Sequence, residues 1–167
     1  PRRLEAEAIR DNILLAAGTL DSRMGGPGFS GFRVEAENVR HYHAKASYGP
    51  ADWRRMLYMT KVRQEREPTF GVFDCPAPSR SRSTTPLQAL SLLNSPFVLQ
   101  QAGLLARRLR HEAGADTRAQ VARACQLALG REPNREELAD ANRLVAEHSL
   151  EAFCRALFNA NEFLFLL

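Results

Sequence analysis

The C-terminal half of the chain contains a series of helix-start and helix-stop signals, which constrain the fold more than any other feature of the sequence. Each start is a residue type that caps helix N-termini, and three of them are followed three residues later by the Glu or Gln of a capping box. Glycine or proline marks the stops. The starts are Thr85, Asn94 or Ser95, Thr117, Asn134 and Ser149, and the stops are Pro96, Gly114 and Gly130.

Apolar residues within these segments recur at the spacing of one buried helical face. The inward residues are predicted to be Val98, Ala102, Leu105 and Leu109, then Val121, Cys125 and Ala128, then Leu138, Ala141 and Val145, and finally Leu150, Phe153, Cys154 and Leu157. Hydrophobic residues make up 44% of the 167-residue chain, which is enough for a substantial core. We therefore predict a single, mostly α-helical domain over 1–167, with an antiparallel helical bundle over 86–167.

An N-terminal helix is predicted over residues 2–17, ended by Gly18, with Leu4, Ala8 and Leu15 on its apolar stripe. Three charged residues, Glu7, Arg10 and Asp11, share another face of this helix. They can form an intrahelical ion pair, or a buried polar network that holds the loop after the helix. We favour the intrahelical ion pair.

Residues 19–50 are predicted to form a long, irregular, Gly/Pro-rich arm, because neither helical nor strand periodicity persists there. An irregular run of this length is uncommon unless it has a function or packs on a partner. The arm contains His41 and His43, but no third ligand lies in sequence reach, so we expect no metal site. A second helix is predicted from Ala51, with Trp53, Met56, Leu57 and Met59 facing inward, and strand-like alternation over 59–62 is the alternative for its end. A loop is predicted over 63–82.

Charge and cysteine content restrict the classes of function. The net charge is only +4, whereas nucleic-acid-binding domains usually carry a larger contiguous basic stripe. Nucleic-acid binding through Arg107, Arg108 and Arg110 is therefore a minor alternative. The three cysteines form no disulfide framework or C-x-x-C motif, and Cys75 lies in a loop. The apolar run at 163–167 is too short to cross a membrane, so we expect no membrane span.

The segment before the first helix of the bundle combines two arginines with three hydroxyl side chains. Guanidinium groups bind carboxylate, sulfate or phosphate, and a helix N-terminus also favours anions. The predicted ligand-binding residues are Arg80, Arg82, Ser83, Thr84 and Thr85. The alternative is internal: the arginines bind an acid such as Asp74, and the hydroxyls only cap the helix.

Catalytic motifs of the common phosphate-binding, zinc-protease and serine-hydrolase types are not present in the sequence. Several acids are candidates for an acid or network role, namely Glu7, Asp11 and Asp74, and Arg10 lies beside the first two. An enzyme acting on an anionic polysaccharide, with Asp74 or Glu7 working beside Arg80 and Arg82, is therefore the second functional hypothesis.

Short motifs spread over nearly the whole chain resemble those of one family. They are R-R-L-x-x-E-x-x-R-D at 2–11, G-G-P at 25–27, R-R-x-x-Y at 54–58, F-D-x-P at 73–76, S-T-T-P-L-Q-A-L with L-N-x-P-F at 83–97, L-G-R-x-P at 129–133 and N-x-N-E-F-L at 159–164. The family is the uncharacterised C-terminal domain of large planctomycete and verrucomicrobial proteins. In those proteins it follows a cytochrome-c-like module and a second planctomycete-specific domain.

This resemblance implies that the chain is a fragment of a larger exported or envelope-associated protein, with the upstream domains of the same polypeptide as partners. It implies no cofactor in this domain, and genomic neighbours of the sulfatase type suggest an anionic glycan as ligand. Family members carry a longer loop than the one at 76–79. The leading hypothesis is a non-catalytic accessory or interaction domain that docks its neighbour through the arm and the N-terminal side and binds a sulfated or carboxylated group.

Overall fold

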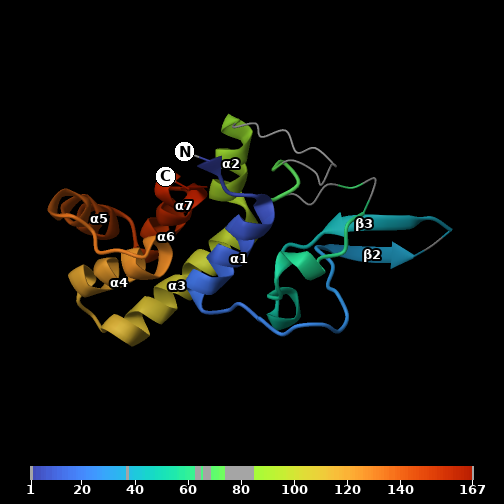
Figure 1. Cartoon of the computed structure of the whole chain (residues 1–167), viewed down its shortest axis with the longest axis horizontal. Helices are drawn as coiled ribbons and strands as arrows, with labels where there is room; N and C mark the ends of the chain where they lie inside the picture. Colours follow the sequence, from blue (N-terminus) through green and yellow to red (C-terminus); the bar gives the residue numbers. More distant parts are fainter. Residues whose placement is uncertain (1, 37, 63–64, 66–68, 74–84, 167) are drawn as a thin grey trace.

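The computed structural model describes residues 2–36, 38–62, 65, 69–73 and 85–166, and the predicted mostly α-helical fold is confirmed. The helices of the described part are α1 (Ala6–Ala17), α2 (Pro86–Asn94), α3 (Pro96–Ala113), α4 (Thr117–Leu129), α5 (Arg135–Glu147), α6 (Leu150–Phe158) and α7 (Asn161–Leu164). Helix α3 lies at the centre and packs against α1, α2, α4 and α6 (Figure 1). Its predicted stripe, Val98, Ala102, Leu105 and Leu109, is fully buried.

The helix starts of the bundle are set by local side-chain caps. Asn134 Oδ1 accepts hydrogen bonds from the N–H groups of Glu136 and Glu137, and Ser149 Oγ accepts one from Ala152, as the sequence predicts. The start of α4 differs from the prediction: Asp116 caps it by accepting from the Arg118 N–H, whereas the expected partner of Thr117, Gln120, donates to the Gly114 carbonyl. An aspartate is as strong a cap as a threonine, and here it stands one residue earlier.

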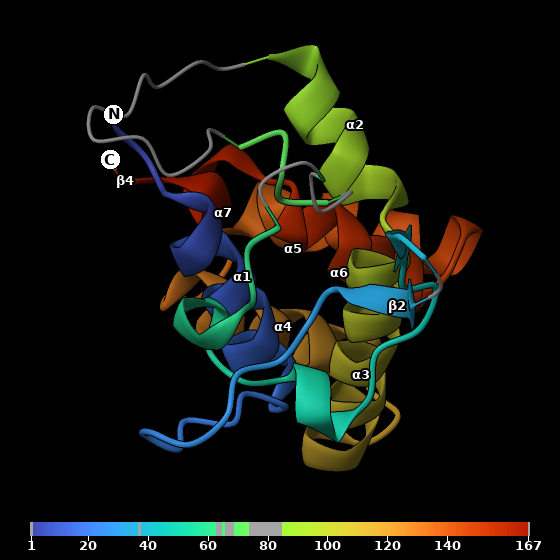
Figure 2. The same ribbon diagram turned by 90° about the vertical axis from the view of Figure 1, so that its right-hand side faces the viewer.

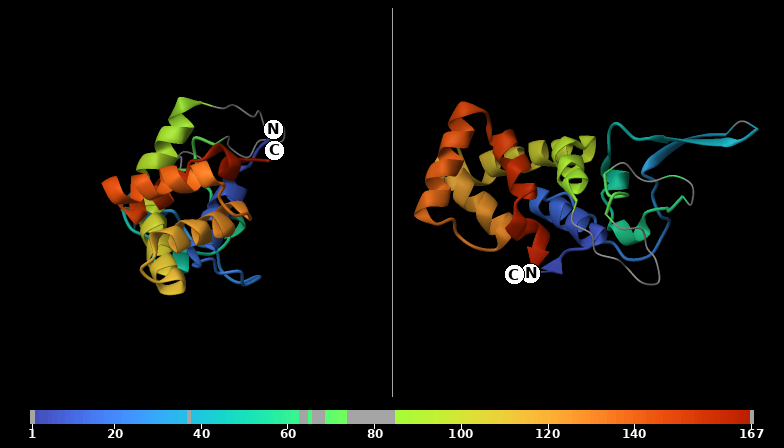
Figure 3. Two further views of the ribbon diagram at one scale, coloured as in Figure 1. Left: turned by 90° about the vertical axis from the view of Figure 1, so that its left-hand side faces the viewer. Right: turned by 90° about the horizontal axis from the view of Figure 1, so that it is seen from above.

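The two ends of the described chain pair with each other (Figure 3). Strand β1 (Arg2–Arg3) runs antiparallel to β4 (Phe165–Leu166), and the Leu4 N–H donates to the Leu164 carbonyl at 2.8 Å. The N-terminal helix therefore begins at Ala6 and not at residue 2, because Arg2 and Arg3 are in the strand. Leu15 is 59% exposed, so its predicted place on the apolar stripe is wrong.

The arm contains regular structure where an irregular run is predicted. Strand β2 (Phe32–Ala36) pairs antiparallel with β3 (Arg40–Ala44), and Figures 1 and 3 show this hairpin projecting from the helical body. Apart from Phe32 and the half-buried Tyr42, the described hairpin residues are exposed. Residues 32–36 alternate apolar and polar side chains, which is a strand signal that the prediction of an irregular arm missed, whereas residues 40–44 carry only part of this pattern.

The predicted second helix from Ala51 is absent, and two single-turn 3₁₀ helices, Pro50–Asp52 and Met56–Tyr58, take its place. Met56 faces inward as predicted, but Leu57 is 71% exposed. Besides the bonds within these turns, the backbone here accepts hydrogen bonds from the preceding arm: the N–H groups of Asp21 and Phe29 donate to the carbonyls of Trp53 and Tyr58. Figure 2, which views the molecule from the side of the arm, shows these segments lying over α1 and α3.

Candidate functional site

The predicted anion site is only partly covered by the described residues. Asp74, Arg80, Arg82, Ser83 and Thr84, like the loop thiol of Cys75, lie outside the described residues. Thr85 is described: it precedes α2, and its backbone N–H donates to Gln88 Oε1 at 3.1 Å. This half of the predicted capping box is confirmed, and anion binding at the arginines stays a prediction.

Gln88 links its own motif to Arg3 of the N-terminal motif and to Val72 beneath the start of α2. Its side chain is buried, its Oε1 also accepts from Arg3 Nη1, and its Nε2 donates to the Val72 carbonyl at 3.0 Å. The Arg3 guanidinium in turn lies 5.3 Å from the centroid of the Phe73 ring. The polar residues of these motifs therefore hold the N-terminus, residues 72–73 and α2 together.

Arg10 and Asp11 of α1 fasten the 52–56 segment to the helical body. The Arg10 guanidinium is 98% buried and donates to the carbonyl oxygens of Asp52 and Arg54. Asp11 accepts the Met56 N–H at 2.7 Å and lies 3.3 Å from Arg55 Nε. These contacts form a polar network that holds residues 52–56, and not the loop directly after the helix, against α1; the intrahelical ion pair with Glu7 stays a prediction.

Two aromatic rings complete the surroundings of Arg10. Its guanidinium carbon lies 4.8 Å from the centroid of Phe29 and 5.0 Å from that of Phe97. Rings on both sides and backbone carbonyls at the edge suit a planar cation, which a point charge such as lysine would not match. The third residue of the predicted network, Glu7, is half-buried on α1 and has a partner of its own.

Arg54, like Arg10, donates hydrogen bonds to backbone carbonyls, and its acceptors lie in the arm. Its Nη1 donates to the Pro27 carbonyl, its Nη2 donates to the carbonyls of Arg23 and Gly25, and its guanidinium stacks 4.0 Å from the Tyr58 ring centroid. The Tyr58 hydroxyl closes the arrangement by accepting the Gly25 N–H at 2.8 Å. The G-G-P motif is thus wrapped around the first arginine of the R-R-x-x-Y motif.

The wrapped loop borders an open pocket of about 420 Å³, which we name the Arg54 pocket. It is lined by Arg23, Met24, Gly25, Gly26, Pro27, Gly28, Ala51 and Arg54. At its rim, Arg23 binds Asp21 through its Nε and Nη2, and this pairing lowers the pKa of the Asp21 carboxyl to about 2. The carboxylate is therefore ionised and engaged, and it is not available as a general acid.

Comparison with known proteins matches residues 1–145 to the family PSD1, described as a protein of unknown function (DUF1553). The chain belongs to the PSD1 family. No curated protein and no solved structure matches it. The resemblance to an uncharacterised domain family, seen first in the motifs, is therefore confirmed.

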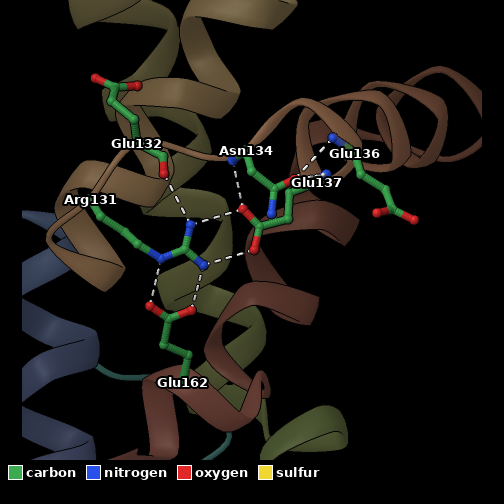
Figure 4. A network of polar contacts seen from close by, with 6 residues as sticks. All are labelled: Arg131, Glu132, Asn134, Glu136, Glu137 and Glu162. Carbon is green, nitrogen blue, oxygen red and sulfur yellow. Dashed lines mark hydrogen bonds and ion pairs between the residues drawn. The ribbon is translucent and has the colours of Figure 1, made fainter. Parts of the chain in front are cut away.

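One PSD1 motif residue, Arg131, forms a surface clamp between three parts of the bundle (Figure 4). Its guanidinium binds both oxygens of Glu162 at 2.6 and 2.7 Å and both oxygens of Glu137 at 2.8 Å. Glu137 also accepts the Asn134 N–H at 2.8 Å. The pKa of Glu137 falls to about 2, because of the hydrogen bonds from Arg131 first and from Asn134 second, and Arg131 also lowers the pKa of Glu162.

The clamp predicts an acid-sensitive contribution to stability. Because the pKa of Glu137 is lower in the folded than in the unfolded chain, its stabilisation is complete above the ordinary value of 4.5 and is lost as the pH falls toward 2. An Arg131→Met variant should therefore have a lower melting temperature than the wild type at neutral pH. This difference should shrink as the pH falls from 4.5 toward 2. Melting curves across this range test it, with Arg143→Met, which breaks an exposed pair with Asp140, as control. A difference in melting temperature that does not change with pH would contradict the clamp.

The remaining predictions for this PSD1 chain concern its cysteines, a membrane span and a metal site. Cys125 and Cys154 are buried as expected, and desolvation raises the pKa of the Cys154 thiol to about 12, so it stays protonated. In the described part of the chain, no helix is long and apolar enough to cross a membrane. No set of three His, Cys, Asp or Glu side chains among the described residues is placed to hold a metal ion; His43 instead lies 3.4 Å from Glu35.

The basic stretch of α3 is also engaged within the molecule. Arg108 donates to the Ala16 carbonyl at 2.9 Å and pairs with Glu112, and Arg110 pairs with Glu151. These contacts occupy two of the three arginines on which the nucleic-acid alternative depends.

Proposed function

We propose that this PSD1 chain is a non-catalytic accessory domain of a larger, exported, cytochrome-linked protein, and that it contacts the upstream part of the same polypeptide through its arm. The observation that carries the proposal is the β2–β3 hairpin. A two-stranded hairpin is at best marginally stable alone in water, yet this one projects from the body with Val34 and Val39 exposed. A neighbouring surface would bury these side chains and pair or cover the strand edges.

The polar and charged residues of the motifs make their contacts within the chain, and this supports the same proposal. Arg10, Asp11, Arg54, Gln88 and Arg131 all bind backbone groups or side chains of other segments. This geometry favours a role as a rigid support that presents the hairpin. It disfavours a role as reacting groups that are aimed at a substrate. The occupant is the upstream polypeptide, because the family motifs resemble those of domains that follow such modules.

Hydrogen exchange on the full-length protein that contains this chain tests the proposal. Peptides covering 32–44 should exchange more slowly in the full-length protein than in the isolated chain, while peptides from α5 should exchange equally in both. Val39→Asp should remove that extra protection, whereas Leu57→Asp, at a similarly exposed apolar position outside the arm, should leave it. Equal exchange of 32–44 in the two proteins would contradict docking through the hairpin.

The proposal also includes binding of a sulfated or carboxylated group at Arg80, Arg82 and the start of α2. Of the candidate acids, Asp11 is occupied by the Met56 N–H and Arg55, which leaves Asp74 or Glu7 as the acid of the enzyme alternative. An Arg82→Ala variant, compared with wild type in a thermal-shift titration with sodium sulfate, tests this site.

A further inference from the structure

The side chain of Arg54 is held in place but is not neutralised by a hydrogen-bonded carboxylate of the described residues. It is 92% buried, and its described acceptors are three backbone carbonyls, which carry only partial charges. Its Nε–H has no acceptor among the described residues. A buried cationic donor in this state gains more from an additional anion than an exposed one does, because water screens it less.

The pocket beside Arg54 has the lining that a small oxyanion requires. Two guanidinium groups and one carboxylate, those of Arg23, Arg54 and Asp21, lie in or at the pocket, so the charge there is positive. Gly26 and Gly28 bring backbone into the wall without side chains, and their N–H groups donate to no described residue. Backbone N–H groups and arginines together are the usual donors for carboxylate, sulfate and phosphate groups.

We propose that the Arg54 pocket binds a carboxylate or sulfate group carried by a molecule of about monosaccharide size. The volume of about 420 Å³ lies in the range of small-molecule sites and exceeds what a bare inorganic ion fills. Arg54, fixed by the loop carbonyls and the Tyr58 ring, provides the buried charge, and the 83% exposed Arg23 meets the ligand from the rim. The proposal rests on described residues alone, and it does not depend on docking of the hairpin.

Thermal-shift titrations of the full chain with sodium glucuronate and sodium sulfate, each against sodium chloride at equal ionic strength, test the pocket. Glucuronate should raise the melting temperature beyond chloride, and more than inorganic sulfate if a sugar-borne group is the ligand. Arg23→Ala leaves the buried network intact and should weaken apparent binding on the order of tenfold, the effect of one lost charge-assisted hydrogen bond. Arg143→Ala, at another exposed and paired arginine, should leave the apparent binding of glucuronate unchanged.

The variants distinguish anion binding in the Arg54 pocket from anion binding at Arg80 and Arg82. A shift that is lost in Arg23→Ala and kept in Arg82→Ala supports the Arg54 pocket. The reverse pattern places the anion at Arg80 and Arg82 and overturns the pocket, as does the absence of any shift beyond that with chloride. Sulfate and glucuronate acting equally would overturn the monosaccharide-sized ligand. Exchange of the hairpin, measured independently, reports on docking in every case.

Discussion

Arg10→Met should lower the free energy of unfolding by about 2–5 kcal/mol. The substitution leaves the buried carbonyls of Asp52 and Arg54 without a donor, at a cost of about 1–3 kcal/mol each, and removes the cation from between Phe29 and Phe97. Methionine has similar length and no charge, so the loss reports on the polar contacts more than on a cavity. Urea unfolding followed by circular dichroism measures it.

Arg55→Met is the matched control for Arg10→Met. Arg55 is also an arginine that contacts this network, but it is 46% exposed and lies 3.3 Å from Asp11, so its removal should cost less than about 1 kcal/mol. If the two variants lose the same stability, Arg10 does not carry the attachment of the 52–56 segment.

Gly28→Ala should cost about 1–3 kcal/mol, the usual penalty of forcing atoms into a packed site. A Cβ atom on residue 28 would lie 2.6 Å from the backbone carbonyl oxygen of Tyr58, which accepts the N–H of the neighbouring Phe29 at 3.0 Å. Because the obstructing atom belongs to the backbone, it cannot rotate away as a side chain could. The two segments must separate, so the pairing of the arm with residues 58–60 should weaken.

Gly49→Ala provides the comparison for this substitution. A Cβ at residue 49 meets no atom within 4 Å, and the residue has a φ of −107°, which alanine adopts freely. Its effect should stay within about 0.5 kcal/mol. Thermal or urea unfolding of both variants decides the matter, and equal losses would show that residue 28 does not approach Tyr58 this closely.

The sequence predicts the bundle well because its determinants are local. Caps such as Asn134 with Glu137 act within one turn, and the stripe of α3 needs only the helical period to be recognised. The hairpin is missed because its apolar–polar alternation is confined to residues 32–36 and follows a Gly/Pro-rich run that indicates irregular structure. The segment after Ala51 is missed because its backbone groups bond to residues 21–29, and a distant partner outweighs local propensity.

The sequence predicts which residues belong to the candidate site, but it does not predict their contacts. Periodicity places Arg10 and Asp11 on one helix, but it does not show that their partners are the carbonyls and N–H of residues 52–56. Arg54 and the G-G-P motif are visible in the sequence, yet nothing in their spacing indicates that one wraps around the other. Backbone acceptors leave no signature in a sequence, and this explains why the Arg54 pocket emerges only from the structure.

The central claim is that residues 52–60 link the arm to the helical body, because they form hydrogen bonds with the arm on one side and with α1 on the other. Native-state amide exchange of Asp21, Phe29 and Met56 tests it directly, because each N–H donates across segments, to the Trp53 carbonyl, the Tyr58 carbonyl and the Asp11 carboxylate. All three amides should be protected in the wild type, and Met56 should lose protection in Asp11→Ala. Exchange of these amides at the rate of an unstructured peptide would contradict the account.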